Sequence, residues 1–383
     1  MTAPVVVVAE QLRRRVPGGI GRYAAWLLRG LRRPEVGAPP VELFVSRRRG
    51  TGPDPLEAYG FPVHRAWLPA PWLVAAWDRG MLAAPRTASV VHAVSLAAPP
   101  VRPARRAGGA ALVVTVYDLA WRSHPEATTA RGRRWHEAAL GRALRAADAF
   151  VVPSEPSAAE LVAAGAPCAQ VRVIPPGLDH LPAPDAAGAR ALLRGLGVDG
   201  PYLLAVGTLE PRKNLERLAA AHALATPSLP GPWPLVVVGP VGWGGRPAAF
   251  AVGSHPGKER RDGLVVAGSV DDGVLAGLYA GARAFAYVPV AEGFGLPPLE
   301  AMTHGVPVVV SAAVPSTAPA PGAVPAALRV EATSVEDIAA ALVRASTDEE
   351  VRSQLVERAA ALVEPMTWTR AARAHVALWR ELS

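Results

Sequence analysis

Two glutamates separated by seven residues stand in the segment EGFGLPPLEAMTHGVPVVVS, residues 292–311. Gly293 and Gly295 let main-chain N–H groups approach a ligand closely, because glycine has no Cβ. The prolines that follow suit the first turn of a helix, and the positive end of a helix dipole favours phosphate. The side chains of Glu292 and Glu300 accept hydrogen bonds from hydroxyls. Main-chain amides that bind phosphate and carboxylates that bind hydroxyls together predict a sugar-nucleotide site.

Two basic residues, Arg212 and Lys213, stand in a second segment, GTLEPRKN, at residues 207–214. The sequence predicts a buried strand before this segment and a helix after it. The two cations would then lie near a helix N-terminus, where the helix dipole disfavours positive charge. This placement indicates an anionic ligand, because such cations can neutralise a diphosphate as it leaves.

Residues 292–311 resemble the signature of the family 4 retaining glycosyltransferases of GT-B fold, and residues 207–214 are the second matching motif. The resemblance implies an α/β fold with two Rossmann-like domains that face each other across a cleft. Residues 1–180 would form the acceptor-side domain, joined by a C-terminal helix at 367–383 that crosses back to it. Residues 181–366 would form the domain that binds the nucleotide sugar.

The same resemblance implies roles for particular residues. Glu300 would hold the ribose hydroxyls, and Glu292 would contact the transferred sugar. Arg212 and Lys213 would hold the diphosphate, and the loop 268–271 would border the base. The donor-binding positions implied are Gly19, Gly207, Arg212, Lys213, Gly268, Val270, Glu292, Gly293, Phe294, Gly295, Leu296 and Glu300. The catalytic residues implied are Glu292, Arg212, Lys213 and Asp118.

The chain departs from the family at Tyr117-Asp118, where members often have His-Asp. If the family histidine assists the chemistry, this chain must use Tyr117 or Asp118 in its place, or do without such a residue. Asp118 has a second interpretation as an N-cap or turn residue. The two roles for Asp118 stay open at this point.

Short apolar runs alternate with helical patterns along the chain, which predicts parallel sheets. The predicted strands are 5–9, 41–45, 90–94, 112–116, 150–152, 171–174, 202–206, 235–238, 264–267, 284–288 and 306–310. The pattern Gly19-x-Gly21-x-x-Ala24 superficially matches a dinucleotide fingerprint, but ten or so residues separate it from the first strand. A nicotinamide enzyme is therefore disfavoured.

Basic residues are concentrated in the first half of the chain. Residues 1–180 contain 23 Arg against 13 Asp and Glu, a net charge of +10, and the remainder carries −2. This excess suggests an anionic partner such as a membrane surface or a lipid phosphate. Trp67, Trp72 and Trp77 among nearby prolines could line a lipid-facing or acceptor surface, or pack locally. We expect no nucleic-acid partner, because the chain has no basic motif interleaved with aromatic residues and no cysteine or histidine spacing typical of zinc sites.

A single cysteine, Cys168, excludes a disulfide framework and suits a reducing cytoplasm. The first residues lack the pattern of a signal peptide, and no apolar run approaches the ~20 residues that span a bilayer. We therefore expect a cytoplasmic enzyme that can associate peripherally with the inner face of the plasma membrane. The sequence contains no Asp-x-Asp pair and no two histidines four apart, so we expect no metal cofactor.

These observations predict a metal-independent, retaining glycosyltransferase with a nucleotide-diphosphate sugar as donor. By frequency in the family, mannose is the expected sugar. The acceptor is a glycan, a lipid-linked sugar or a small molecule. Two alternatives remain at this point: a nucleotide-sugar epimerase of the same fold, and a non-catalytic partner subunit. The altered Tyr117-Asp118 pair favours the partner subunit, and the intact pair of glutamates opposes it.

Overall fold

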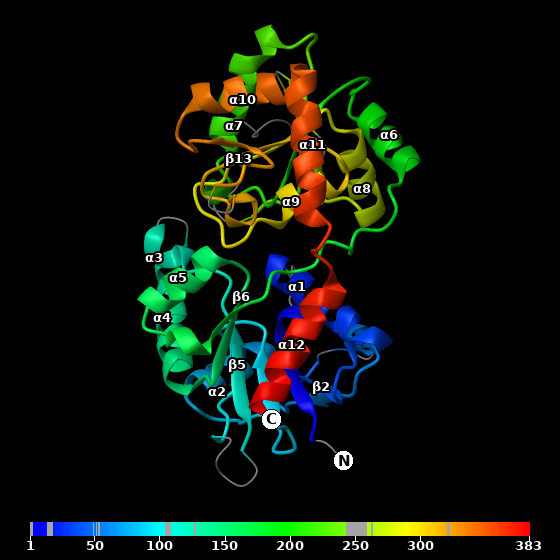
Figure 1. Cartoon of the computed structure of the whole chain (residues 1–383). Helices are drawn as coiled ribbons and strands as arrows, with labels where there is room; N and C mark the ends of the chain where they lie inside the picture. Colours follow the sequence, from blue (N-terminus) through cyan, green and yellow to red (C-terminus); the bar gives the residue numbers. More distant parts are fainter. Residues whose placement is uncertain are drawn as a thin grey trace. The chain divides into compact units, whose positions relative to one another are not determined.

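The computed structural model describes residues 3–13, 18–48, 50, 52, 54–103, 109–125, 128–242, 259–261, 263–319 and 322–383. The chain forms two compact units (Figure 1). Unit 1 consists of Met1–Gly177 and Met366–Ser383, and unit 2 consists of Leu178–Pro365. The boundaries predicted from the sequence, 180/181 and 366/367, lie three residues and one residue further along the chain than these divisions.

Unit 1 is built on a seven-stranded sheet with the order β3-β2-β1-β4-β5-β6-β7 and parallel pairing throughout. The strands are β1 (Val5–Val8), β2 (Val41–Val45), β3 (Val63–Arg65), β4 (Val90–Ala93), β5 (Ala111–Thr115), β6 (Ala149–Val152) and β7 (Val171–Val173). The four valines of β1 are all buried, as is typical of a parallel sheet covered on both faces. The sequence did not predict β3, because this edge strand has three residues and little buried surface.

The helices of unit 1 include one from the far end of the chain. They are α1 (Gly18–Leu31), α2 (Ala70–Asp78), α3 (Ala120–Ser123), α4 (Ala130–Ala146), α5 (Glu155–Ala163) and α12 (Trp368–Leu382). Helix α12 packs on α1 (Figure 1). Its Trp368 and Trp379 are fully buried in the core of unit 1. The two helices approach closely at Gly30, where a Cβ would lie 2.9 Å from the Trp368 carbonyl oxygen. The predicted return of the C-terminal helix to the first domain is therefore observed.

Unit 2 is built on a second seven-stranded sheet, with the order β10-β11-β9-β8-β12-β13-β14. Its strands are β8 (Leu203–Val206), β9 (Leu235–Val238), β10 (Glu259–Arg261), β11 (Leu264–Gly268), β12 (Ala284–Tyr287), β13 (Val308–Ser311) and β14 (Leu328–Val330). All described pairings are parallel except that of β10 with β11. The sequence predicted neither β10 nor β14, the two short strands at the sheet edges.

The helices of unit 2 cover this sheet. They are α6 (Ala186–Gly195), α7 (Leu215–Ala225), α8 (Asp272–Gly281), α9 (Leu296–Thr303), α10 (Val335–Thr347) and α11 (Glu349–Val363). Short 3-10 segments also occur, at Glu10–Arg13, Pro34–Val36, Pro55–Tyr59, Cys168–Gln170, Pro211–Lys213, Thr226–Ser228 and Pro315–Thr317. None of the helices in the described parts of the chain has the length and apolar character needed to cross a bilayer.

The strand order of unit 2 fixes where a ligand site is expected. Strand β8 is the first of its unit, and its two neighbours β9 and β12 lie on opposite sides of it. From β8 the chain first adds strands on the β9 side of the sheet and then crosses to add β12 and the strands beyond it on the other side. The space between β8 and β12 is therefore a topological switch point. In open parallel sheets, ligands bind outside the carboxyl ends of the strands at such a point.

Candidate functional site

The segments that follow β8 and β12 bring the predicted basic and acidic residues together. The 3-10 turn Pro211–Lys213 follows β8, and the loop with Glu292 follows β12. Asn214 joins the two connections, because its side-chain amide donates to the carbonyls of Val288, over 3.0 Å, and Ala332, over 2.7 Å. Asn214 has the left-handed backbone that asparagine tolerates better than most residues, with φ of 57°. This residue ends the turn and starts α7.

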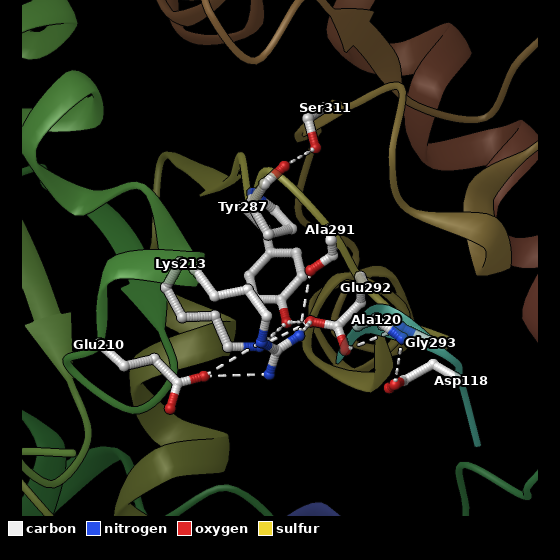
Figure 2. Close-up of polar contacts among 12 residues, drawn as sticks. Asp118, Ala120, Glu210, Lys213, Tyr287, Ala291, Glu292, Gly293 and Ser311 are labelled. Carbon is white, nitrogen blue, oxygen red and sulfur yellow. Dashed lines mark hydrogen bonds and ion pairs between the residues drawn. The ribbon is translucent and has the colours of Figure 1, made fainter. Parts of the chain in front are cut away.

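The centre of the site is a cluster of Lys213, Tyr287 and Glu292 (Figure 2). The Lys213 ammonium donates to Glu292 Oε2 over 2.6 Å and to the Tyr287 hydroxyl over 2.5 Å. The Tyr287 hydroxyl in turn donates to the same carboxylate oxygen. Each of the three polar groups therefore contacts the other two, and none can turn away without breaking two contacts.

Arg212 completes the cluster from one side. Its Nη1 lies 3.2 Å from Glu292 Oε2 and donates to the Ala291 carbonyl over 3.0 Å. Its Nη2 and Nε donate to Glu210 Oε1 over 3.0 Å and 3.2 Å. The Val290 N–H donates to the Arg212 carbonyl over 3.0 Å, which ties the two connections together through the main chain. The guanidinium is therefore held in one orientation beside Glu292.

Burial and charge act in opposite directions on these groups. Burial would raise the pKa of Glu292, but the charges of Lys213 and Arg212 outweigh it and hold that pKa well below its usual value. Burial lowers the pKa of Lys213, although the Glu292 charge opposes this shift. Burial raises the pKa of Tyr287 well above its usual value, and the Glu292 charge raises it further. The phenol therefore stays protonated as a donor to the carboxylate.

The glycine loop after Glu292 is held by the segment after β13 (Val308–Ser311). The Ser316 N–H donates to the Phe294 carbonyl over 2.9 Å, and the Ser316 hydroxyl donates to the Gly295 carbonyl over 2.7 Å. Gly295 has φ of 92°, and a Cβ there would lie 2.5 Å from Cγ1 of the buried Val314. Only glycine fits this position without a shift of its neighbours, so the loop that leads into α9 has a fixed path.

Helix α9 begins at Leu296, with prolines in its first turn as predicted, and Gly305 lies in the left-handed region just after its end. Glu300 lies within this helix and has a different environment from Glu292. Its carboxylate is fully buried, with His180 Nε2 2.9 Å from Oε1. The Tyr279 hydroxyl donates to Oε2 over 2.8 Å. The two predicted glutamates thus have different protein partners.

Three further donor-binding predictions fall at strand ends of unit 2. Gly207 follows β8, and a Cβ on it would lie 3.7 Å from Lys213 Cε, so its main chain runs beside the lysine stem. Gly268 ends β11 and accepts a hydrogen bond of 2.9 Å from the Gly239 N–H at the end of β9. Val270 is half-buried in the connection from β11 to α8. All three positions lie at the carboxyl edge of the sheet.

Two predicted residues belong to unit 1. Gly19 lies in the first turn of α1. Asp118 follows β5, and its Oδ1 accepts a hydrogen bond of 3.0 Å from the Ala120 N–H at the start of α3. This contact matches the alternative interpretation of Asp118 as a turn or N-cap residue. The Tyr117 hydroxyl donates to the Val94 carbonyl over 3.1 Å, and its ring packs edge-on against Tyr23 with centroids 5.4 Å apart.

The structure also brings in residues that the sequence did not single out. Glu210 and Asn214 stand inside the GTLEPRKN segment, but their partners could not be read from it. Tyr287 looked like one more apolar strand residue. Ser311 at the end of β13 donates to the Pro289 carbonyl over 2.6 Å and fixes the path of the loop before Glu292 (Figure 2). These contacts join segments far apart in the sequence, and only the fold reveals them.

Two family models match the chain, one in each unit. The model described as glycosyl transferase 4-like domain matches residues 18–177. The model described as glycosyl transferases group 1 matches residues 194–362. The second range contains every residue of the cluster around Glu292.

Curated proteins match part of the chain. The O-antigen chain mannosyltransferase B of Escherichia coli is 35% identical over 168 residues, which are 44% of this chain and 42% of that protein. The D-inositol 3-phosphate glycosyltransferase of Xylanimonas cellulosilytica is 36% identical over 179 residues, which are 44% of this chain and 41% of that protein. The matches thus cover less than half of the length of these relatives.

Solved structures match the whole chain at low identity. The sucrose-phosphate synthase of Thermosynechococcus elongatus has a TM-score of 0.69 and 21% identity and covers 100% of this chain and 99% of its own. The Anabaena protein HepE in complex with UDP-glucose has a TM-score of 0.71 and 17% identity and covers 99% of both chains. At this identity the likeness shows the fold, and it confirms the predicted α/β class with two Rossmann-like domains of GT-B type.

Proposed function

We propose, because the chain belongs to the group 1 glycosyltransferases of family 4, that it transfers a sugar from a nucleotide-diphosphate donor with retention of configuration. The observation that carries this proposal is the cluster of Lys213, Arg212 and Glu292 at the carboxyl ends of β8 and β12. Two cations and one carboxylate at a topological switch point suit a ligand with both a diphosphate and hydroxyls.

The cations hold the diphosphate in this proposal. Lys213 and Arg212 carry two positive charges, and Glu292 and Glu210 carry two negative charges, so the cluster has no net charge. A diphosphate that enters must therefore take the place of the carboxylates as the partner of the cations. Glu292, released from Lys213, then contacts hydroxyls of the transferred sugar. The loop amides of Phe294, Gly295 and Leu296 lie along the sugar and the phosphates.

The transfer step needs no separate protein base. The bond between the anomeric carbon and the diphosphate oxygen breaks, and the acceptor oxygen bonds to the same face of that carbon. The acceptor proton passes to the leaving phosphate. Lys213 and Arg212 stabilise the negative charge that develops on the diphosphate, in a site where charge interactions are stronger than in water. In this proposal, Asp118 of unit 1 orients the acceptor.

We propose mannose as the transferred sugar and a glycan, a lipid-linked sugar or a small molecule as the acceptor. The name of the Escherichia coli relative, a mannosyltransferase, supports this sugar. No metal is needed in this mechanism, because Arg212 and Lys213 supply the positive charge. Among the residues that the structure describes, no group of three or more His, Cys, Asp or Glu gathers to hold a metal ion.

The test is a donor panel with GDP-mannose, UDP-glucose and UDP-galactose, first for thermal stabilisation and then for transfer. We expect GDP-mannose to stabilise the protein most and turnover to survive EDTA. We also expect NMR of the product to show the same anomeric configuration as the donor. Turnover lost in EDTA and restored by Mn²⁺ or Mg²⁺ would contradict the charge argument. Conversion of the donor alone to its epimer would indicate an epimerase, and binding without turnover on any acceptor would favour a partner subunit.

A further inference from the structure

We propose that His180 and Tyr279 are positioning residues that hold the Glu300 carboxylate in the orientation in which it accepts ribose hydroxyls of the donor. This inference rests on the proposed function and on the role that the family resemblance implies for Glu300, which is to hold the ribose hydroxyls of the donor. It goes further by naming two residues that determine how strongly the enzyme prefers a ribonucleotide to its deoxy counterpart. No sequence motif pointed to either residue.

The two donors reach Glu300 from different parts of unit 2. His180 lies three residues after Gly177, the last residue of the first segment of unit 1, and its Nε2 is 2.9 Å from Glu300 Oε1. Tyr279 lies in α8, and its hydroxyl donates to Oε2 over 2.8 Å. An ionised carboxylate can only accept hydrogen bonds, so His180 Nε2 carries the hydrogen in this contact. Because His180 and Tyr279 donate to different oxygens, they fix the plane of the carboxylate.

Tyr279 is itself held in place. Its ring stacks on His304 with centroids 5.5 Å apart and meets Phe285 with centroids 5.6 Å apart. The His304 ring is anchored to the same helix as Glu300, with Nδ1 2.7 Å from the Glu300 carbonyl oxygen. The Tyr279 hydroxyl therefore keeps a fixed direction relative to α9.

Burial explains why this support matters. The side chains of Glu300 and His180 are 0% and 1% exposed. A buried carboxylate needs hydrogen-bond donors, so loss of either donor favours rotation of the carboxylate. A ribose that reaches Glu300 must displace the atoms that cover the carboxylate, while His180 and Tyr279 keep the carboxylate itself in place.

The readout that isolates this role is a ratio of two affinities measured on the same protein. A buried site that hydrogen-bonds a hydroxyl strongly rejects the analogue that lacks it, because the site is left unpaired. The probe is the nucleoside diphosphate, UDP or GDP, that the wild-type protein binds more tightly, compared with its 2′-deoxy counterpart by calorimetry. We expect the wild-type protein to prefer the ribonucleotide by about 10- to 100-fold, as for a hydrogen bond to a charged group.

We expect His180→Ala and Tyr279→Phe each to lower this ratio at least threefold. Gln places an amide donor near the position of His Nε2, so His180→Gln should recover part of the preference. The matched control is His222→Ala, which removes a partly buried hydrogen bond of 2.8 Å to the Trp233 carbonyl, elsewhere in unit 2. This control loses stability of a similar kind and should keep the wild-type ratio.

The outcomes separate the inference from the proposed function. If the wild-type protein does not prefer the ribonucleotide, Glu300 does not bind ribose, and both the assignment and the inference are wrong. If the wild-type protein prefers it and His180→Ala and Tyr279→Phe keep the full preference, only the positioning role is wrong. If His180→Ala does not fold, Tyr279→Phe decides alone, because it removes one oxygen atom and keeps the ring.

Discussion

At the scale of the residue, the lysine at position 213 is an exception in this chain. Lys213 is one of only two lysines among 40 basic residues, so the chain uses arginine almost everywhere that a cation serves. The structure gives a physical reason for the exception. Its ammonium lies within 2.6 Å of both a carboxylate oxygen and a phenol oxygen, beside the Arg212 guanidinium. A compact ammonium fits this space, whereas a second planar guanidinium is wider and points its donors in fixed directions.

We therefore predict that Lys213→Arg loses most of the transferase activity and approaches Lys213→Ala. The loss of one donor to the charge that develops on the diphosphate implies a fall of about 10²–10³ in kcat. Steady-state kinetics with saturating donor measures this fall. The control is Lys258→Arg, at a position outside the described residues, which should leave kcat nearly unchanged. Turnover of Lys213→Arg close to that of the wild-type protein would mean that only charge is needed there.

At the scale of helices and strands, apolar runs that alternate with helical patterns predicted most of the fold. Runs such as Val5–Val8 are buried on both faces, so hydrophobicity alone reveals them. The missed strands β3, β10 and β14 have three residues each and lie at sheet edges. Such short edge strands do not produce a recognisable run of apolar residues in the sequence. The loop, the helix start and the two glutamates were predictable because they are contiguous in sequence. Their partners Tyr287 and His180 were not, because tertiary packing alone brings them there.

The loop between β12 and α9 provides the prediction at this scale. We expect Gly295→Ala to destabilise unit 2 by about 1–3 kcal/mol and to weaken donor binding. The alanine would have to adopt a left-handed backbone conformation, and its methyl group would lie 2.5 Å from Cγ1 of Val314. Chemical denaturation and calorimetric titration with the nucleotide measure the two effects.

The control for this variant is Gly322→Ala. Gly322 also has a positive φ, of 79°, but a Cβ there would meet no atom of the described residues within 4 Å. The control therefore carries only the backbone strain, about 1–2 kcal/mol, and should leave nucleotide affinity unchanged. If Gly295→Ala binds nucleotide as tightly as the control does, the close packing against Val314 does not shape the donor loop.

At the scale of the whole molecule, positive charge and exposed aromatic surface occur in the same unit. Residues 1–180 carry a net charge of +10. Trp67 and Trp72 are 68% and 67% exposed, whereas Trp77 packs in the core, so only two of the three tryptophans can form a surface. The N–H of the exposed Arg47 donates to the Leu68 carbonyl over 2.8 Å, which places a basic segment beside them. Tryptophan favours membrane interfaces, and arginine favours anionic lipid.

We predict that the protein binds vesicles rich in phosphatidylglycerol and not vesicles of phosphatidylcholine alone. Salt should release it, because the screening length falls from about 10 Å at 0.1 M to about 3 Å at 1 M. The double variant Trp67→Ser and Trp72→Ser should lose most of the binding in a sedimentation assay. Val324→Ser, which replaces an exposed apolar residue of unit 2, should keep it. Equal binding to neutral and anionic vesicles would mean that the arginines are ordinary surface charge. Anionic-vesicle binding unaffected by the tryptophan variant would leave charge as the sole attraction.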